Sequence, residues 1–115
     1  MLVKRFEDAE PYEAPNHWDV VGLRLQGFEE GGPANQWVGL SHYLPGGGAG
    51  PDSTPFEKVY VVLDGEATLT VGGSETALRR YDSCTIWPGE ERKIENRSNH
   101  ICTLLVVIPY PDEAS

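Results

Sequence analysis

The fold of this chain is decided by the stretch KVYVVLDGEATLTVGG, which spans residues 58–73. Its first six residues are rich in β-branched and aromatic side chains, which fit a pleated sheet. The pair Asp64-Gly65 is a strong signal for a tight hairpin turn. Residues 66–71 then alternate polar and apolar side chains, and Gly72-Gly73 turns the chain again. The stretch therefore predicts two antiparallel strands joined by a hairpin.

Further short strands are expected on both sides of this hairpin. The same signals place them over residues 19–26, 36–44, 75–79, 83–87, 92–95 and 101–108. The glycine-rich segment 45–51 is expected to be an irregular loop. About eight short strands separated by turns are typical of an all-β sandwich or barrel, which hides its sheet edges.

The composition narrows the classes of function. The chain has 115 residues, enough for one domain, and its 18 acidic and 9 basic residues give a formal charge of −9. This balance argues against binding to nucleic acid, which needs a basic face, and against binding to anionic membranes. The longest strongly apolar run, residues 104–108, is far shorter than the roughly 20 residues of a membrane-spanning helix. The N-terminus does not look like a signal peptide, so we expect a cytoplasmic protein with Cys84 and Cys102 as buried thiols.

Two segments resemble the signature stretches of the cupin superfamily. The first leads from Pro45-Gly46-Gly47-Gly48 to the strand that ends at Gly65. The second leads from Tyr81-Asp82-Ser83 through Pro88-Gly89 to Asn96. The resemblance implies a small single-domain cupin of the type-2 barrel, an all-β double-stranded β-helix of the jelly-roll type. It divides the domain 1–115 into N-terminal strands and loop (1–35), a barrel core (36–109) and a C-terminal tail (110–115).

The resemblance also implies that the metal-ligand positions of the family hold other residues in this chain. In metal-binding cupins the first motif supplies two histidines and a glutamate, and the second supplies a third histidine. Counting back from the turn glycine, the glutamate position is Lys58, and the third histidine position is Arg92. The first two histidine positions fall on Asp52 and Thr54, or one residue earlier on Pro51 and Ser53.

These replacements change the chemistry of the expected site. A lysine ammonium and a guanidinium offer only hydrogen-bond donors and positive charge, so they repel a metal ion and attract an anion. Alternation along the strand places Lys58 and Tyr60 on one face, and the family geometry implies that Lys58 and Arg92 both point into the barrel mouth. The alternative is that the two cations lie on the surface or pair with acids such as Glu57 or Asp52.

Other side chains are candidates for the same cavity. His42 has a side chain suited to proton transfer, and in the family plan its strand lines the cavity. Tyr60 and Tyr43 carry phenolic donors for a developing oxyanion. Trp37 and Trp87 are either core aromatics or the apolar wall of a ligand pocket.

The prediction is a cupin that binds a compact anionic or carbonyl-bearing organic molecule without a metal or another cofactor. Lys58 and Arg92 would hold the ligand with the two tryptophans, and His42 or Tyr60 would move a proton. Similar metal-poor cupins imply an isomerase, epimerase or cyclase. A binding or sensor cupin without catalysis is the first alternative, so whether the chain is an enzyme stays open.

Two further expectations concern a metal and a partner. The second alternative is a metal-dependent cupin oxygenase or lyase with displaced ligands, for which His17, His42 and Glu57 are the candidates. His17 itself is expected to be solvated. We also expect a homodimer, in which the segment 2–6 adds to a sheet edge of the partner.

Overall fold

The structure is a computed structural model, and it describes residues 1–111. Residues 112–115 of the predicted tail lie outside the described residues. One short 3₁₀-helix, η1 (Phe6–Asp8), precedes nine strands. The strands are β1 (Glu10–Tyr12), β2 (His17–Gln26), β3 (Gln36–Asp52), β4 (Lys58–Asp64), β5 (Glu66–Val71), β6 (Ser74–Arg79), β7 (Ser83–Ile86), β8 (Arg92–Glu95) and β9 (Cys102–Pro109). Within residues 1–111, no helix has the length and apolar character needed to cross a membrane.

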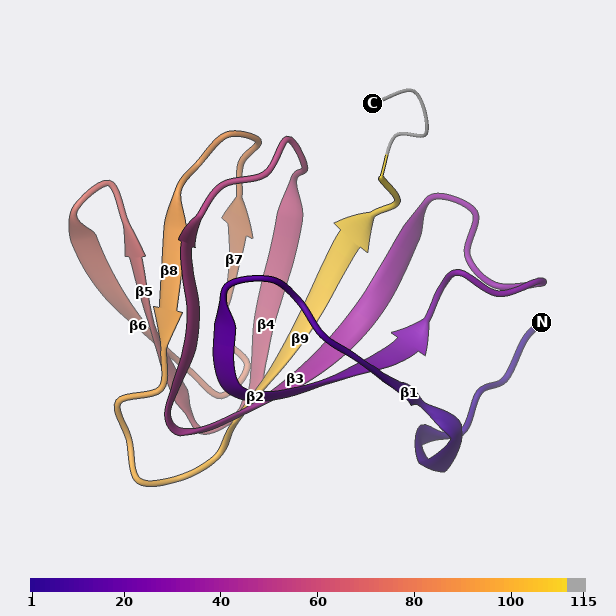
Figure 1. Cartoon of the computed structure of the whole chain (residues 1–115), viewed down its shortest axis with the longest axis horizontal. Helices are drawn as coiled ribbons and strands as arrows, with labels where there is room; N and C mark the ends of the chain where they lie inside the picture. Colours follow the sequence, from indigo (N-terminus) through magenta and orange to yellow (C-terminus); the bar gives the residue numbers. More distant parts are fainter. Residues whose placement is uncertain (112–115) are drawn as a thin grey trace.

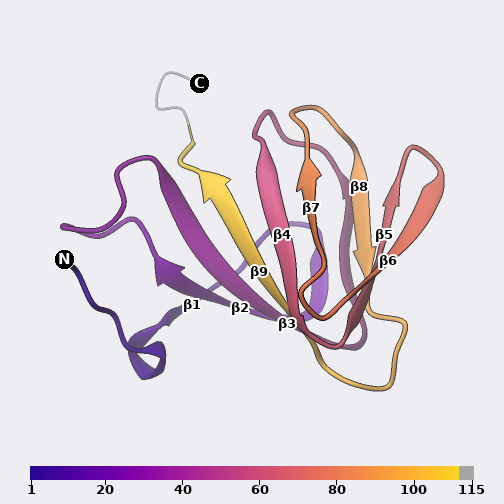
Figure 2. The ribbon, with the colours of Figure 1, turned by 180° about the vertical axis from the view of Figure 1, so that it is seen from behind.

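The nine strands form one antiparallel sheet that curls into a nearly closed barrel (Figure 1). Their order is β6-β5-β8-β3-β9-β4-β7, with β2 and then β1 added beside β3. The long strand β3 joins the two halves of the barrel, because its first part pairs with β9 and its last part pairs with β8. Figure 2 shows the reverse side, where β4 and β7 lie beside each other. The predicted all-β barrel is therefore confirmed.

The glycine-rich segment departs from the prediction, because β3 continues through it as a strand. Gly48 pairs with Trp18 of β2 and with Glu95 of β8, so two strands approach it closely. A Cβ atom on Gly48 would lie 2.7 Å from the Trp18 ring and would also meet the carbonyl oxygen of Ile94. The segment was expected to be an irregular loop, but it is a strand in which Gly48 allows a close approach of its neighbours.

The inward faces of two strands change from charged to apolar along their length. On β4 the buried residues are Lys58, Tyr60 and Val62, and on β8 they are Arg92 and Ile94. The last residue in each series, Val62 on β4 and Ile94 on β8, belongs to the apolar core.

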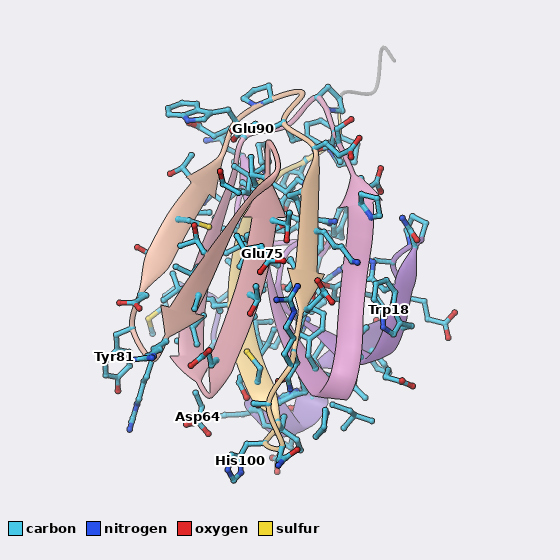
Figure 3. All side chains as sticks on the ribbon, turned by 90° about the vertical axis from the view of Figure 1, so that its left-hand side faces the viewer. Trp18, Asp64, Glu75, Tyr81, Glu90 and His100 are labelled. Carbon is cyan, nitrogen blue, oxygen red and sulfur yellow. The ribbon has the colours of Figure 1, made fainter. Side chains whose placement is uncertain are left out.

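The two cations lie toward the same end of the barrel. Figure 3 labels Glu90, two residues before β8, at one end, and Asp64, where β4 finishes, at the other. Since Lys58 and Arg92 each begin their strand, the fold brings them to the same end.

Candidate functional site

A cavity of about 330 Å³ opens into the barrel at this end. Its lining includes Lys58, Arg92, Tyr60 and Trp37 from the predicted set of site residues. The strand β1 and the loop after it cover one side of the cavity with Tyr12 and its neighbours. Four of the predicted site residues, from β3, β4 and β8, therefore meet in one place.

Arg92 is a buried cation whose hydrogen bonds are incompletely satisfied. Its side chain is 5 % exposed, and its Nε donates a hydrogen bond of 3.0 Å to the hydroxyl of Tyr60. Its Nη1 is buried and has no hydrogen-bond partner among residues 1–111. Burying a charged hydrogen-bond donor without an acceptor costs free energy, so an oxygen acceptor bound beside Nη1 would stabilise the cavity.

Lys58 is a second buried cation beside it. It is also 5 % exposed, and it forms no ion pair among the described residues. Burial and the nearby charge of Arg92 lower the pKa of Lys58 to about 8, against an opposing effect of Asp52. Of the acids expected as alternative partners, Asp52 lines the cavity without an ion pair, and Glu57 is exposed and outside the lining.

His17 lines the cavity, although the sequence indicated it only as a candidate metal ligand. It lies at the start of β2, where it was expected to be solvated. Its Nδ1 lies 2.7 Å from the carbonyl oxygen of Pro15, and because a carbonyl only accepts, this geometry assigns the proton to Nδ1. Burial lowers the pKa of His17, and the charges of Arg92 and Lys58 lower it further, against the opposing effects of the Pro15 hydrogen bond and of Asp52. In the neutral imidazole with the proton on Nδ1, the lone pair is on Nε2.

The expectation that His42 lines the cavity is wrong. The inward residues of this part of β3 are Trp37, Ser41 and Tyr43, so alternation turns His42 to the other face. Leu44, two residues after His42 and therefore on the same face of β3, is 42 % exposed. A period of two residues is visible in a sequence, but it does not say which of the two faces is inside.

Only one of the two predicted tryptophans belongs to the cavity. Trp87 follows β7, is 59 % exposed and is outside the lining. Trp37 does line the cavity, where its ring meets the edge of the Tyr12 ring at a centroid distance of 5.2 Å. Tyr12 was missed because the three-residue strand β1 is too short to leave a pattern in the sequence.

The positions where related proteins keep a metal do meet in this cavity. Asp52, Thr54, Lys58 and Arg92 all line it, which favours this register over the one through Pro51 and Ser53. Two of the four side chains are cations that have no lone pair to offer, so the residues present do not fit a divalent metal ion.

The alternative metal ligands considered from the sequence, His17, His42 and Glu57, are not brought together either. His17 lines the cavity, whereas His42 and Glu57 do not. Within residues 1–111, no group of three or more histidine, cysteine, aspartate or glutamate side chains is placed to hold a metal ion. Cys84 and Cys102 are free thiols.

The sequence profile of the cupin domain matches residues 39–108. A Mycobacterium tuberculosis protein named beta-D-galactosidase Rv1717 is 48 % identical over 111 residues, which cover 96 % of each chain. Among solved structures, the polyketide cyclase RemF from Streptomyces resistomycificus superposes with a TM-score of 0.84 at 18 % identity, covering 98 % of this chain and 88 % of that one. A predicted oxalate decarboxylase from Thermotoga maritima superposes with a TM-score of 0.79 at 23 % identity, covering 96 % and 100 %.

Replacing Lys58 with methionine tests whether its charge is unfavourable in the folded cavity. An unfolded lysine keeps its proton up to its ordinary pKa of 10.5, whereas the folded one loses it at about 8. Between these pH values the unfolded chain binds more protons, so the wild type gains stability as the pH rises. We expect the free energy of unfolding of the wild type, minus that of Lys58→Met, to increase by about 2 kcal/mol between roughly pH 7 and pH 10, measured by urea denaturation. A difference that stays constant with pH would contradict this.

Proposed function

The chain belongs to the cupin family, and we propose that its cavity binds a compact small molecule with a carboxylate, enolate or similar oxygen acceptor. The observation that carries this proposal is the buried Nη1 of Arg92, which lacks a partner among residues 1–111, next to the buried cation Lys58. Two like charges repel each other in an interior of low dielectric constant, and an anion between them relieves that repulsion. Ligand binding is thus expected to replace an unfavourable contact rather than only to add a favourable one.

For the reaction, we propose proton transfer of the isomerase, epimerase or cyclase type. The support for this is the position of His17, whose unprotonated Nε2 provides a base in the cavity in place of His42. Tyr60 accepts the Arg92 hydrogen bond, which leaves its own O–H free to donate to a developing oxyanion. Lys58 and Arg92 stabilise the enolate that forms when His17 takes a proton from the adjacent carbon.

Hydrolysis of a β-D-galactoside is the second candidate, favoured by the mycobacterial relative of that name. Glycoside hydrolysis generally uses two carboxyl groups beside the scissile bond. The cavity lining contains two carboxylates, Asp52 and Glu13. The transition state is positively charged, so Lys58 and Arg92 oppose it, and an ionised Asp52 must offset them. Galactoside hydrolysis therefore depends on Asp52 more strongly than proton transfer does.

Three expectations from the sequence remain proposals. The cavity would serve equally for ligand binding without catalysis, which is the role of a sensor. We propose that the chain acts in the cytoplasm as a homodimer. Exposed apolar side chains support the dimer, because Leu2, Val3 and Phe6 in the N-terminal segment are all exposed.

The anion site is tested by the binding of pyruvate, a compact molecule with a carboxylate and a carbonyl group. We expect Lys58→Met and Arg92→Met each to weaken pyruvate binding about tenfold or more in calorimetric titrations, because a charge-assisted hydrogen bond is lost. Lys93→Met is the matched control, since Lys93 follows Arg92 on the same strand but is outside the cavity lining. Wild-type affinity should also fall as the pH rises above about 8, where Lys58 loses its proton. Equal affinity in the wild type and both cavity variants would remove the anion site.

Galactoside hydrolysis is tested with a chromogenic nitrophenyl β-D-galactoside. If the second candidate holds, the wild type releases nitrophenol, and Asp52→Asn lowers kcat/KM by about a hundredfold or more. Glu57→Gln, which removes an exposed carboxylate outside the cavity lining, should leave the rate unchanged. Absence of hydrolysis by the wild type, or an Asp52→Asn variant with full activity, would rule this candidate out.

A further inference from the structure

The cavity holds a third cation, Arg24, which the functions proposed above do not use. Arg24 lies two residues before the end of β2 and lines the same cavity as Lys58 and Arg92. Three aromatic rings surround its guanidinium group. The central carbon is 4.5 Å from the centroid of the Phe28 ring, 5.5 Å from that of Tyr12 and 5.6 Å from that of Trp37.

The Nε of Arg24 is buried and has no hydrogen-bond partner among residues 1–111. In this part of the chain only one other buried side-chain nitrogen or oxygen is in the same condition, namely Nη1 of Arg92. Buried polar groups are nearly always hydrogen-bonded, so two exceptions on arginines of one cavity need a common explanation. A ligand that fills the cavity would supply it.

The aromatic rings around Arg24 do not satisfy its hydrogen bonds. A cation–π contact covers the face of a guanidinium group, whereas the N–H donors point outward in the plane of that group. Glu29, a carboxylate whose pKa is lowered chiefly by the hydrogen bond from Lys4 and only slightly by the charge of Arg24, is already held by Lys4 at 3.0 Å. The edge of Arg24 thus keeps the donors that match a planar carboxylate.

Arg24 and Arg92 come from different parts of the barrel. The strand β2 pairs with β1 and β3, whereas β8 pairs with β3 and β5. In Figure 1 the C-terminal end of β2 and the strand β8 lie on opposite sides of the barrel. We propose that Arg24 is a second anion subsite, so that the ligand carries two acidic groups, one for Lys58 and Arg92 and the other for Arg24. This inference rests on the anion site proposed above and adds the class of ligand, a dicarboxylate-like molecule.

The test compares dicarboxylates with monocarboxylates of equal carbon number at constant ionic strength. The pairs are succinate and butyrate, glutarate and pentanoate, and adipate and hexanoate, measured by calorimetric titration. We expect the dicarboxylate of matching length to bind the wild type about tenfold tighter than its partner. Arg24→Met should abolish this preference while monocarboxylate binding persists. Arg80→Met is the matched control, since Arg80 also lies over an aromatic ring, that of Tyr81, but is exposed.

A second measurement uses the wild type and does not depend on the folding of any variant. The ¹H–¹⁵N resonance of Arg24 Nε should shift when the preferred dicarboxylate is added and should stay in place with the matched monocarboxylate. Equal affinities for all pairs, with an unmoved Arg24 resonance, would overturn the second subsite and leave the first intact. Failure of every carboxylate to bind would overturn both the first subsite and the second.

Discussion

The hydrogen bond from Arg92 Nε to the Tyr60 hydroxyl connects two strands that are not neighbours in the sheet. It spans the barrel interior between β8 and β4 and holds the guanidinium group beside Lys58. The binding properties of the cavity depend on this hydrogen bond. It holds the Arg92 guanidinium group through one neutral partner, and Nη1 of the same group has no hydrogen-bond partner among residues 1–111. A site built in this way is incomplete until an acceptor arrives.

The charges of the chain are divided between the outside and the inside of the barrel. Four of the nine basic residues, Lys4, Arg79, Lys93 and Arg97, form ion pairs with surface glutamates. The three that line the cavity, Arg24, Lys58 and Arg92, form no ion pair among the described residues. The formal charge of −9 belongs to the whole chain, whereas the cavity lining holds three cations and two carboxylates, Asp52 and Glu13. An acidic exterior also repels anions from nonspecific sites, which favours their selective uptake in the cavity.

Local patterns in the sequence predict most of the barrel but only part of the site. The strand Glu66–Val71 was predicted with its observed bounds, because alternation and the flanking turns are local signals. Lys58 and Arg92 followed from alternation together with the family resemblance. The inward face of β3 was assigned wrongly, and His42 with it, since burial depends on which strands cover which face. Arg24 was missed, and His17 was expected to be solvated, because both reach the cavity through the pairing of distant segments, which a single sequence does not display.

The central claim is that the cavity receives an anion between Lys58 and Arg92. The most direct test is a crystal structure of the chain grown with pyruvate and compared with one grown without it. We expect carboxylate density within hydrogen-bond distance of Arg92 Nη1 and Lys58 Nζ, with the Arg92 to Tyr60 hydrogen bond retained. A cavity that holds only water in the presence of saturating pyruvate, with both cations turned toward solvent or toward acidic side chains, would contradict it.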